Sequence, residues 1–258
     1  LLLLVGARKG AEKWLCPSIS FLLLMSRSRF LTILPALFFG LLAVSCGTKE
    51  KEDPNGVELN FGHFPNVTHV QGLVAHHFSR QGKGWFEERL KEATGKDVRI
   101  NWYVYNAGPS AMEAVFARSI ELAYVGPSPA INAFVRSRGE DIRMIAGAVE
   151  GGAALVVPKD SSLKEPADFR GKVIATPQLG NTQDVSARAW FSRGGLHVTQ
   201  RGGDVTLLPT SNPEQLSMIR QGKLDGVWTV EPWVSTASRC SVRARSGGCG
   251  WASPAAGA

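Results

Sequence analysis

The alternation of apolar and polar positions over residues 57–230 predicts strands and helices that follow one another along the chain. Strands are expected where short runs rich in Val, Ile, Leu and aromatic residues are bounded by Gly, Pro or charged residues. Several of these runs are apolar throughout, which is typical of strands covered on both faces of a parallel sheet. The expected strands are Val57–Gly62, Val98–Tyr105, Ile120–Val125, Ile142–Val149, Ala154–Pro158, Lys172–Thr176, Val205–Pro209 and Leu224–Val230.

Helical periodicity fills the segments between these strands. Met112, Val115 and Phe116, for example, fall on one helix face at positions i, i+3 and i+4. Strands that alternate with helices predict an α/β fold with parallel sheets. The expected helices are His69–Ser79, Trp85–Thr94, Ala111–Arg118, Pro129–Arg138, Thr182–Arg193 and Pro213–Gln221.

Small polar residues stand where several of these helices begin, soon after a strand. Backbone N–H groups at an exposed helix start favour an anion by about 0.3–1 kcal/mol. The carboxyl ends of strands in an open α/β sheet face the binding crevice, so four or five such starts are expected to converge on an uncharged anion site. A single cap is common in α/β proteins, and the prediction depends on the recurrence. The expected starts are capping boxes at Ser110–Glu113 and Asn212–Gln215, caps at Ser128 and Asn181, and a helix opening at Pro65–Thr68.

The positive charge of the chain is confined to its two ends. The 258 residues carry a formal net charge of +7. Residues 1–46 hold five bases and one acid, and residues 236–258 hold three bases and no acid, which leaves 21 bases and 21 acids in residues 47–235. Non-specific nucleic-acid binding depends on a surplus of Lys and Arg. The neutral central region therefore predicts that nucleic acid is not a partner.

Residues 25–46 have the pattern of a secretory signal peptide, in which a charged start is followed by an apolar run and then by small residues. The apolar run, Phe30–Val44, is short for a membrane span of about 20 residues. Cys46 follows Ser45 and resembles the lipidated cysteine of a bacterial lipobox, although Leu42 stands one position too far from it. We predict lipidation at Cys46, with a plain signal peptide as the alternative.

The remaining end segments are expected to contribute nothing to the fold. Residues 1–24 precede Met25 and contain no Met, so we interpret them as a non-native upstream extension. Residues 47–56 are polar and would form a tether. Residues 236–258 lack Leu, Ile, Phe, Asp and Glu, and such a composition cannot bury a core. We expect these residues to form a low-complexity tail that is either translated out of frame or disordered.

Cysteine and histidine usage narrows the chemistry. The absence of Cys from residues 47–235 excludes a disulfide, a Cys-ligated metal and a Cys nucleophile there. Four histidines cluster early in the chain, but their spacing matches no zinc pattern. We therefore predict no metal site and consider His69 a hydrogen-bond donor. The cysteines are Cys16, Cys46, Cys240 and Cys249, and the clustered histidines are His63, His69, His76 and His77.

Five blocks, in order over residues 57–234, resemble one protein family. They are Val57–Pro65, Ala111–Ala130, Asp168–Thr176, Gly180–Asp184 and Gln215–Trp233. They resemble the substrate-binding proteins of ABC importers, in the group that takes nitrate, sulfonates and taurine. Within the second block, Ser119 and Glu121 replace the small-residue turn and the Asp that are usual in the family.

The resemblance implies a type II periplasmic-binding-protein fold, in which two α/β lobes flank a cleft. Lobe 1 would span residues 57–147 and lobe 2 residues 148–231. The chain would leave lobe 1 near Ala146–Gly152. Residues 232–258, after Glu231, would hold the hinge return to lobe 1 and then the low-complexity tail. Members of the family continue well past this point, so we expect the first lobe to be incomplete and the chain to be a truncated copy.

The same resemblance implies binding without chemistry and without a cofactor. A monomeric protein, held by its lipid in the periplasm or cell envelope, would bind a small anion such as an aliphatic sulfonate, taurine or nitrate and deliver it to a membrane permease. Uncharged donors suit such a weakly basic oxyanion. Glu231 would serve as partner to an amine, and Trp233 would form an apolar wall or pack at the hinge. The candidate ligand contacts are Asn66, Thr68, His69, Gly108, Ser110, Gly126, Ser128, Asn181, Thr182, Glu231 and Trp233.

The alternative is a thiamin-pyrimidine-related binding protein or enzyme on the same fold. The enzyme consumes an active-site His and relies on a cysteine-rich segment and pyridoxal phosphate, which the Cys-free region and the export signal disfavour. A transcription-factor effector domain would need a helix-turn-helix before residue 57. A phosphate-handling enzyme would need a P-loop or a GxGxxG motif, and neither occurs. We therefore predict that the protein is not an enzyme.

Overall fold

The computed structural model of the chain describes residues 2–6, 56–199, 202–238 and 242–245. The predicted signal peptide, Cys46 and nearly all of the predicted tether lie outside these residues. Within them, no helix is long and apolar enough to cross a membrane.

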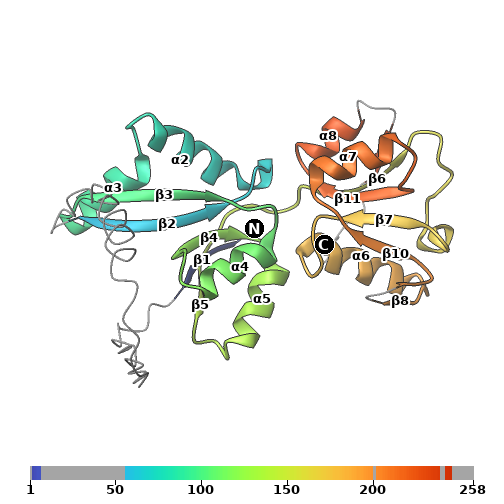
Figure 1. Ribbon diagram of the computed structural model, residues 1–258, viewed down its shortest axis with the longest axis horizontal. Coiled ribbons are helices and arrows are strands. Elements are labelled where there is room, and N and C mark those ends of the chain that lie inside the picture. The colour runs from blue at the N-terminus through green and yellow to red at the C-terminus, as the bar shows by residue number, and fades with distance from the viewer. Residues whose placement is uncertain (1, 7–55, 200–201, 239–241, 246–258) are drawn as a thin grey trace, which may run out of the picture. The chain divides into compact units, whose positions relative to one another are not determined.

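The first sheet contains five strands in the order β3-β2-β4-β1-β5 (Figure 1). Strand β2 runs parallel to both β3 and β4, whereas β1 is antiparallel to β4 and β5. The strands are β1 (Leu2–Gly6), β2 (Val57–His63), β3 (Val98–Val104), β4 (Leu122–Val125) and β5 (Ile142–Gly147). A short 3-10 helix, η2 (Val67–His69), leads into helix α2 (Val70–Arg80), and α3 (Trp85–Thr94), α4 (Gly108–Phe116) and α5 (Pro127–Arg136) complete the helices beside this sheet.

Helices cover both faces of this sheet because neighbouring residues of its central strands point to opposite sides. Ala123 and Val125 of β4 pack in one cluster with Ala111 and Met112 of α4. Tyr124, between them, packs on the other face in a cluster that includes residues of α3. A strand buried on both sides needs a continuous apolar run, as the sequence of β4 has.

The second sheet has the order β10-β7-β11-β6-β12. Strand β7 is parallel to β10 and β11, whereas β6 is antiparallel to β11 and β12. The strands are β6 (Ala153–Pro158), β7 (Val173–Thr176), β10 (Thr206–Pro209), β11 (Gly226–Val230) and β12 (Val242–Arg245), with a separate pair β8 (Val198–Thr199) and β9 (Gly202–Gly203). The helices are the 3-10 turn η3 (Pro166–Phe169), α6 (Thr182–Arg193), α7 (Asn212–Arg220) and α8 (Trp233–Ser238).

Two apolar clusters, one of them containing α6 and the other α7 and α8, hold this second sheet. Phe191 of α6 packs with Phe169 and Trp228 in the first cluster. Leu216 of α7 and Ala237 of α8 pack with buried strand residues in the second cluster. The α/β fold predicted from the pattern is confirmed, and both sheets are mixed rather than purely parallel.

Both ends of the chain add a strand that composition did not predict. Residues 2–6 form β1, although residues 1–24 were expected to lie outside the fold. Residues 242–245 form β12 on the edge of the second sheet, and Ala237 is buried at 1% exposure, although residues 236–258 were expected to bury nothing. A short segment needs no core of its own when neighbouring strands supply the hydrogen-bond partners, as β6 does for β12 and as β4 and β5 do for β1.

The chain passes from the first sheet to the second between β5 and β6. Gly151 and Gly152 lie in this crossing with φ of 76° and 85°, in the left-handed region that favours glycine. After β11 the chain touches the loop ahead of α2, where the backbone N–H of Val67 donates to the Glu231 carbonyl oxygen at 2.8 Å. It then continues as α8, which packs on the second sheet.

Candidate functional site

A cavity of about 510 Å³ is lined by residues that follow the carboxyl ends of parallel strands in both sheets. Five helix starts contribute to it, those of η2, α4, α5, α6 and α7. This convergence is the arrangement expected from the helix starts in the sequence. The lining residues are Phe64, Asn66, Thr68, His69, Asn106, Ala107, Gly108, Gly126, Pro127, Pro129, Val149, Glu150, Gly151, Ala153, Pro177, Asn181, Thr182, Gln183, Ser186, Asn212, Trp228 and Val230.

Most of the candidate ligand contacts predicted from the sequence lie in this lining. Those in the lining are Asn66, Thr68, His69, Gly108, Gly126, Asn181 and Thr182. Those outside it are Ser110, Ser128, Glu231 and Trp233.

Three of the predicted contacts outside the lining, Ser110, Glu231 and Trp233, make hydrogen bonds within the protein instead. Ser110 donates its hydroxyl to Gln178 Oε1 at 3.0 Å, and Trp233 donates its indole N–H to Asn66 Oδ1 at 2.9 Å. The Glu231 carboxylate accepts from the backbone and the hydroxyl of Ser235 at 3.1 and 3.0 Å. Glu231 and Trp233 therefore tie the segment after β11 together, and Ser110 joins the α4 start to the loop after β7.

Sequence reasoning missed several polar residues of the lining. Asn106 lies two residues after β3, so its place at the carboxyl end of a strand was a signal that could have found it. Asn212 was considered only as a cap. Gln183 and Ser186 follow Thr182 on the cavity side of α6. Glu150 lies in the crossing between the sheets, and no pattern in the sequence marked it.

Three helices begin one to three residues earlier than predicted, so the residues that cap them are not the predicted ones. Helix α4 starts at Gly108, so Ser110 lies within its first turn and is not a cap. Helix α5 starts at Pro127 after Gly126, which makes Ser128 a residue of the first turn. Ser211, not Asn212, forms the capping box of α7 with Glu214. The cap predicted at Asn181 is confirmed, because its Oδ1 accepts from the Asp184 N–H at 2.8 Å.

These earlier starts reduce the number of amide donors because prolines now occupy the first turns. Pro127 and Pro129 are the first and third residues of α5, and neither has an N–H group. Helices α4 and α7 each carry a proline at the second position, Pro109 and Pro213. The start of α6 has no proline, so it is the best supply of backbone donors at the cavity.

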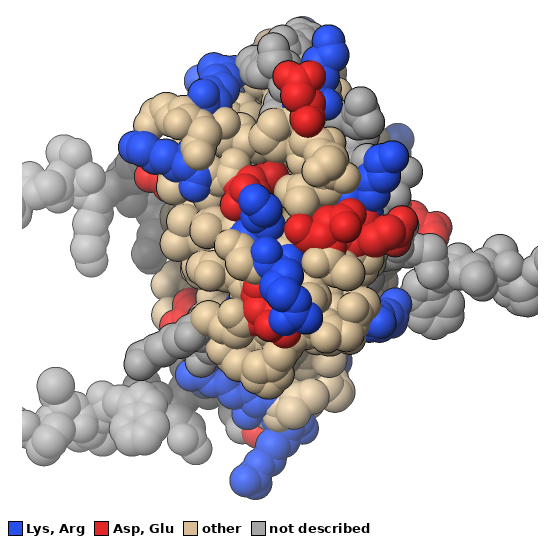
Figure 2. Space-filling view, turned by 90° about the vertical axis from the view of Figure 1, so that its right-hand side faces the viewer, with Lys and Arg blue, Asp and Glu red and all other residues tan. Residues whose placement is uncertain are grey.

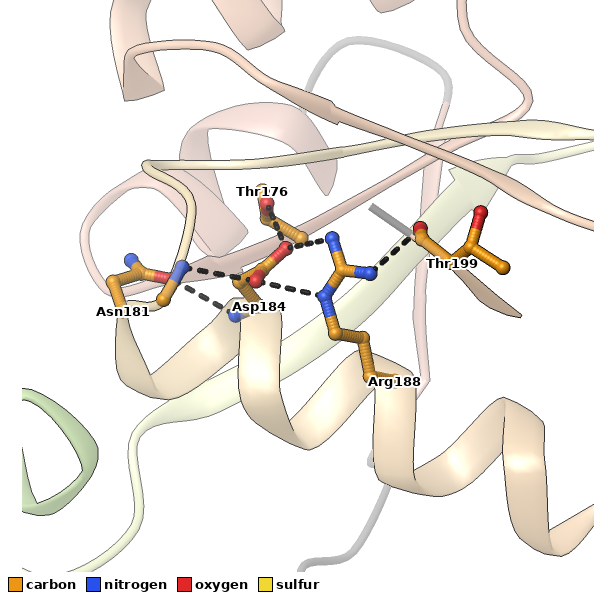
Figure 3. Close-up of polar contacts among 6 residues, drawn as sticks. Thr176, Asn181, Asp184, Arg188 and Thr199 are labelled. Carbon is orange, nitrogen blue, oxygen red and sulfur yellow. Dashed lines mark hydrogen bonds and ion pairs between the residues drawn. The ribbon is translucent and has the colours of Figure 1, made fainter. Parts of the chain in front are cut away.

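A buried carboxylate fixes the start of α6 (Figure 3). Asp184, only 1% exposed, accepts from the Thr176 hydroxyl at 3.1 Å and from the Gly180 N–H at 3.0 Å. Arg188 donates to both oxygens of the same carboxylate, at 2.9 and 3.2 Å, and to the Thr199 carbonyl oxygen at 2.8 Å. The ion pair neutralises the Arg188 charge within the protein, so the cavity gains a rigid helix start and no cation.

Thr182, the first residue of α6, carries a buried hydroxyl group that has no hydrogen-bond partner among the described residues. It faces Gly126 at the start of α5, where an added Cβ atom would overlap Thr182 Oγ1. A buried hydroxyl without a partner costs roughly 1–3 kcal/mol. A ligand oxygen in the cavity would remove that cost.

His69 is a neutral donor at the cavity wall. Its Nδ1 accepts the backbone N–H of Phe64 at 3.3 Å, so the ring proton must be on Nε2. Burial, helped by the nearby His63, lowers the pKa of His69 from 6.5 to about 3. At neutral pH the ring therefore offers an N–H group and no positive charge.

His63 and His76 form a separate pair behind the cavity wall. His63 Nδ1 lies 3.2 Å from the Phe64 carbonyl oxygen, which can only accept, so His63 Nε2 accepts from His76 Nδ1 at 2.8 Å. Burial lowers the pKa of both rings. The described residues contain no group of three or more His, Cys, Asp or Glu that could hold a metal ion.

The charge around the cavity is sparse. Among the described residues that line it, none is Lys or Arg, and Glu150 is the one acid. Figure 2 shows another part of the surface, the end of the molecule that carries the second sheet, where basic and acidic side chains are interspersed. The site can therefore offer hydroxyl, amide and imidazole donors, with apolar contacts from Phe64, Trp228 and Val230.

Known proteins resemble this chain in sequence and in fold. Residues 52–242 match the NMT1-like family. Over 152 residues the chain is 26% identical to a protein of Escherichia coli (strain K12) described as an aliphatic sulfonates-binding protein, an alignment that covers 58% of this chain and 45% of that protein. The chain thus spans less than half the length of this relative.

Two solved structures share the fold. The alkanesulfonate-binding protein of Xanthomonas axonopodis pv. citri, bound to MOPS, is 24% identical with a TM-score of 0.53. The periplasmic aliphatic sulphonate binding protein of Escherichia coli is 21% identical with a TM-score of 0.51. Each comparison covers 72% of this chain and 59% of the other. At these identities the likeness shows the fold alone, and it confirms the predicted periplasmic-binding-protein fold class.

Replacing Asp184 by Asn should lower the free energy of unfolding by about 3 kcal/mol, because it leaves the partly buried Arg188 without its counter-charge. Urea denaturation of Asp184→Asn measures this loss. The control is Glu92→Gln in the exposed Arg89–Glu92 pair, which should cost less than about 1 kcal/mol. Equal losses in the two variants would show that Asp184 does not organise the start of α6.

The buried His69 should make the protein less stable in acid. Between pH 6.5 and about 3 the unfolded state binds a proton at this residue and the folded state does not, so the free energy of unfolding falls as the pH decreases. Between pH 7 and pH 5 the fall should be about 2 kcal/mol smaller in His69→Asn than in the wild type.

Denaturation curves of both proteins at the two pH values measure this difference. His77→Asn, at an exposed position of α2, is the matched control for the removal of a histidine side chain. An unchanged dependence in His69→Asn would contradict the assignment of a neutral buried ring.

Proposed function

We propose, since this chain belongs to the NMT1-like family, that it is the solute-binding component of an ABC importer and binds a small organic sulfonate. It would act outside the cytoplasm, in the periplasm or cell envelope, with Cys46 as the lipid anchor after removal of the signal peptide. It would hold its solute in the cavity and deliver it to a membrane permease without transforming it.

The observation that carries this proposal is a cavity with donors from both sheets and no Lys or Arg in its described lining. A sulfonate is a very weak base whose charge is spread over three oxygens, so hydrogen bonds from neutral groups suffice to bind it. His69 Nε2–H and the hydroxyls of Thr68 and Thr182 are the donors we assign, together with the amides at the start of α6. Asn66 and Asn181 already use their Oδ1 atoms within the protein.

The size of the cavity favours an organic sulfonate over nitrate. A volume of about 510 Å³ is that of a site for a small organic molecule, and it far exceeds what a four-atom anion fills. Phe64, Trp228 and Val230 would contact the carbon chain. For taurine, the amine would pair with Glu150 in the cavity lining rather than with Glu231, whose carboxylate accepts from Ser235.

Binding would hold the two sheets together around the solute. Asn106 already donates to the Pro177 carbonyl oxygen at 3.3 Å across the cavity, and Ser110 bonds Gln178 beside it. A solute that accepts hydrogen bonds from both sides would favour a closed arrangement of the two sides over an open one. The shift of this equilibrium is set by the difference between the solute's affinities for the closed and the open arrangement.

The proposal is tested by titrating the full chain with small solutes and following its thermal unfolding. A solute present at a thousandfold excess over its Kd should raise the free energy of unfolding by about 4 kcal/mol. We expect ethanesulfonate and taurine to stabilise the chain more than nitrate does. Stabilisation by a thiamin pyrimidine, with none by any sulfonate, would favour the alternative function on the same fold.

Gly126→Ala should weaken sulfonate binding at least tenfold. The added methyl group would overlap Thr182 Oγ1 and displace that hydroxyl from the cavity. Isothermal titration calorimetry with ethanesulfonate measures the change. Gly147→Ala is the matched control, because no atom that the structure describes lies within 4 Å of the added carbon, so binding should be unchanged. Wild-type affinity in Gly126→Ala would remove Thr182 from the binding site.

A further inference from the structure

The start of α7 reaches the cavity with few backbone donors of its own. Its second residue, Pro213, has no N–H group, and the Ser211 side chain accepts from the N–H group of Glu214 in the capping box. Asn212, the first residue of the helix, lines the cavity and is only 3% exposed. A donor that this helix start offers to a solute must therefore come from Asn212.

Thr229 of β11 lies behind Asn212. The side chains of β11 alternate between two faces, and Trp228 and Val230 reach the cavity. Thr229, between them, lies on the other face with Val227, which packs in one cluster with residues of α7. There Thr229, itself only 1% exposed, donates its hydroxyl to Asn212 Oδ1 at 2.9 Å.

This hydrogen bond decides which end of the Asn212 amide is left for a solute. A carboxamide has one acceptor oxygen and one NH2 group that donates two hydrogen bonds. Thr229 engages the oxygen, and in the described part of the chain the nitrogen has no partner and is not fully buried. Gln215 Oε1, one turn along the helix, has no partner either, so it does not take this nitrogen. The amide therefore presents N–H groups to the cavity.

Two other amides of the lining are held in the same sense. Asn66 Oδ1 accepts from Trp233 at 2.9 Å, and Gln183 Oε1 accepts from Asn181 at 3.0 Å. Asn106 is held in the opposite sense, because its nitrogen donates to a carbonyl oxygen. The amides that keep a group for the solute thus present mainly N–H donors.

We propose that Asn212 is a solute-binding residue and that Thr229 is the positioning residue that leaves it only N–H groups to offer. The pair selects a solute whose charged head group has no protonated oxygen. This role rests on the proposed function, because it concerns the same cavity. Every orientation of a sulfonate places an acceptor oxygen against Asn212, whereas a phosphonate monoanion must turn its one O–H group away from this amide.

The affinities of the full chain for ethanesulfonate and ethylphosphonate test this pair. Isothermal titration calorimetry in mildly acidic buffer, where ethylphosphonate is mainly a monoanion, measures both. Thr229→Val keeps the side-chain volume and removes the hydroxyl, so the Asn212 amide is free to turn its oxygen to the cavity. We expect ethanesulfonate binding to weaken about fivefold, and the preference for ethanesulfonate over ethylphosphonate to fall by about as much. Thr229→Ser, the matched control, keeps the donor and should keep both affinities within about twofold of the wild type.

A second arm separates positioning from general stability. Asn212→Ala alone should weaken ethanesulfonate binding at least about tenfold, because it removes a donor to a charged group. In that background Thr229→Val should change the affinity by less than about twofold, since Thr229 acts through Asn212.

Three results would overturn this proposal and leave the proposed function intact. They are wild-type ethanesulfonate affinity in Asn212→Ala, an unchanged preference in Thr229→Val, and equal weakening by Thr229→Val with and without Asn212. Absence of ethanesulfonate binding by the wild type would instead overturn the proposed function, and the role of the pair with it.

Discussion

Parallel pairing of strands is the constraint on which the site depends. A parallel strand must be followed by a crossover, and each crossover leaves the sheet at the same edge. In the first sheet this places the residues after β2, β3 and β4 together, and in the second sheet those after β7 and β10. Five helix starts thus meet at one cavity although the segments are far apart in the sequence.

Neutral polar groups dominate this cavity because the charged side chains behind its wall are paired with each other. Asp184 and Arg188 lie directly behind the start of α6, yet each is the other's partner, and together they hold the turn from Thr176 to Asp184. His69 is held neutral by burial and by the backbone N–H that its Nδ1 accepts. The donors that remain have fixed directions, which favours selection by geometry over selection by charge.

The sequence was sufficient for most strands and helices of residues 57–230, and it was insufficient for the exact starts of the helices. Apolar runs identified the strands because β4 and β11 are buried on both faces, and the Asn181 cap was found because Asp184 follows it at the required spacing. Ser110 and Ser128 were predicted to be caps just outside their helices, whereas both lie in a first turn. The neighbouring prolines did not mark the boundary, because proline fits the first turn of a helix as well as the turn before it. Glu150 and β1 depend on long-range placement, which local periodicity does not encode.

The paired glycines in the crossing between the sheets limit how this protein can change over evolutionary time. Gly151 and Gly152 both have φ in the left-handed region, and Gly152 has no room for a Cβ atom against Thr68. Any other L-amino acid there would strain the backbone at the point where the chain enters the second sheet. Mutations that adapt the protein to a new solute are therefore expected to accumulate in the rest of the cavity wall, while these two glycines remain unchanged.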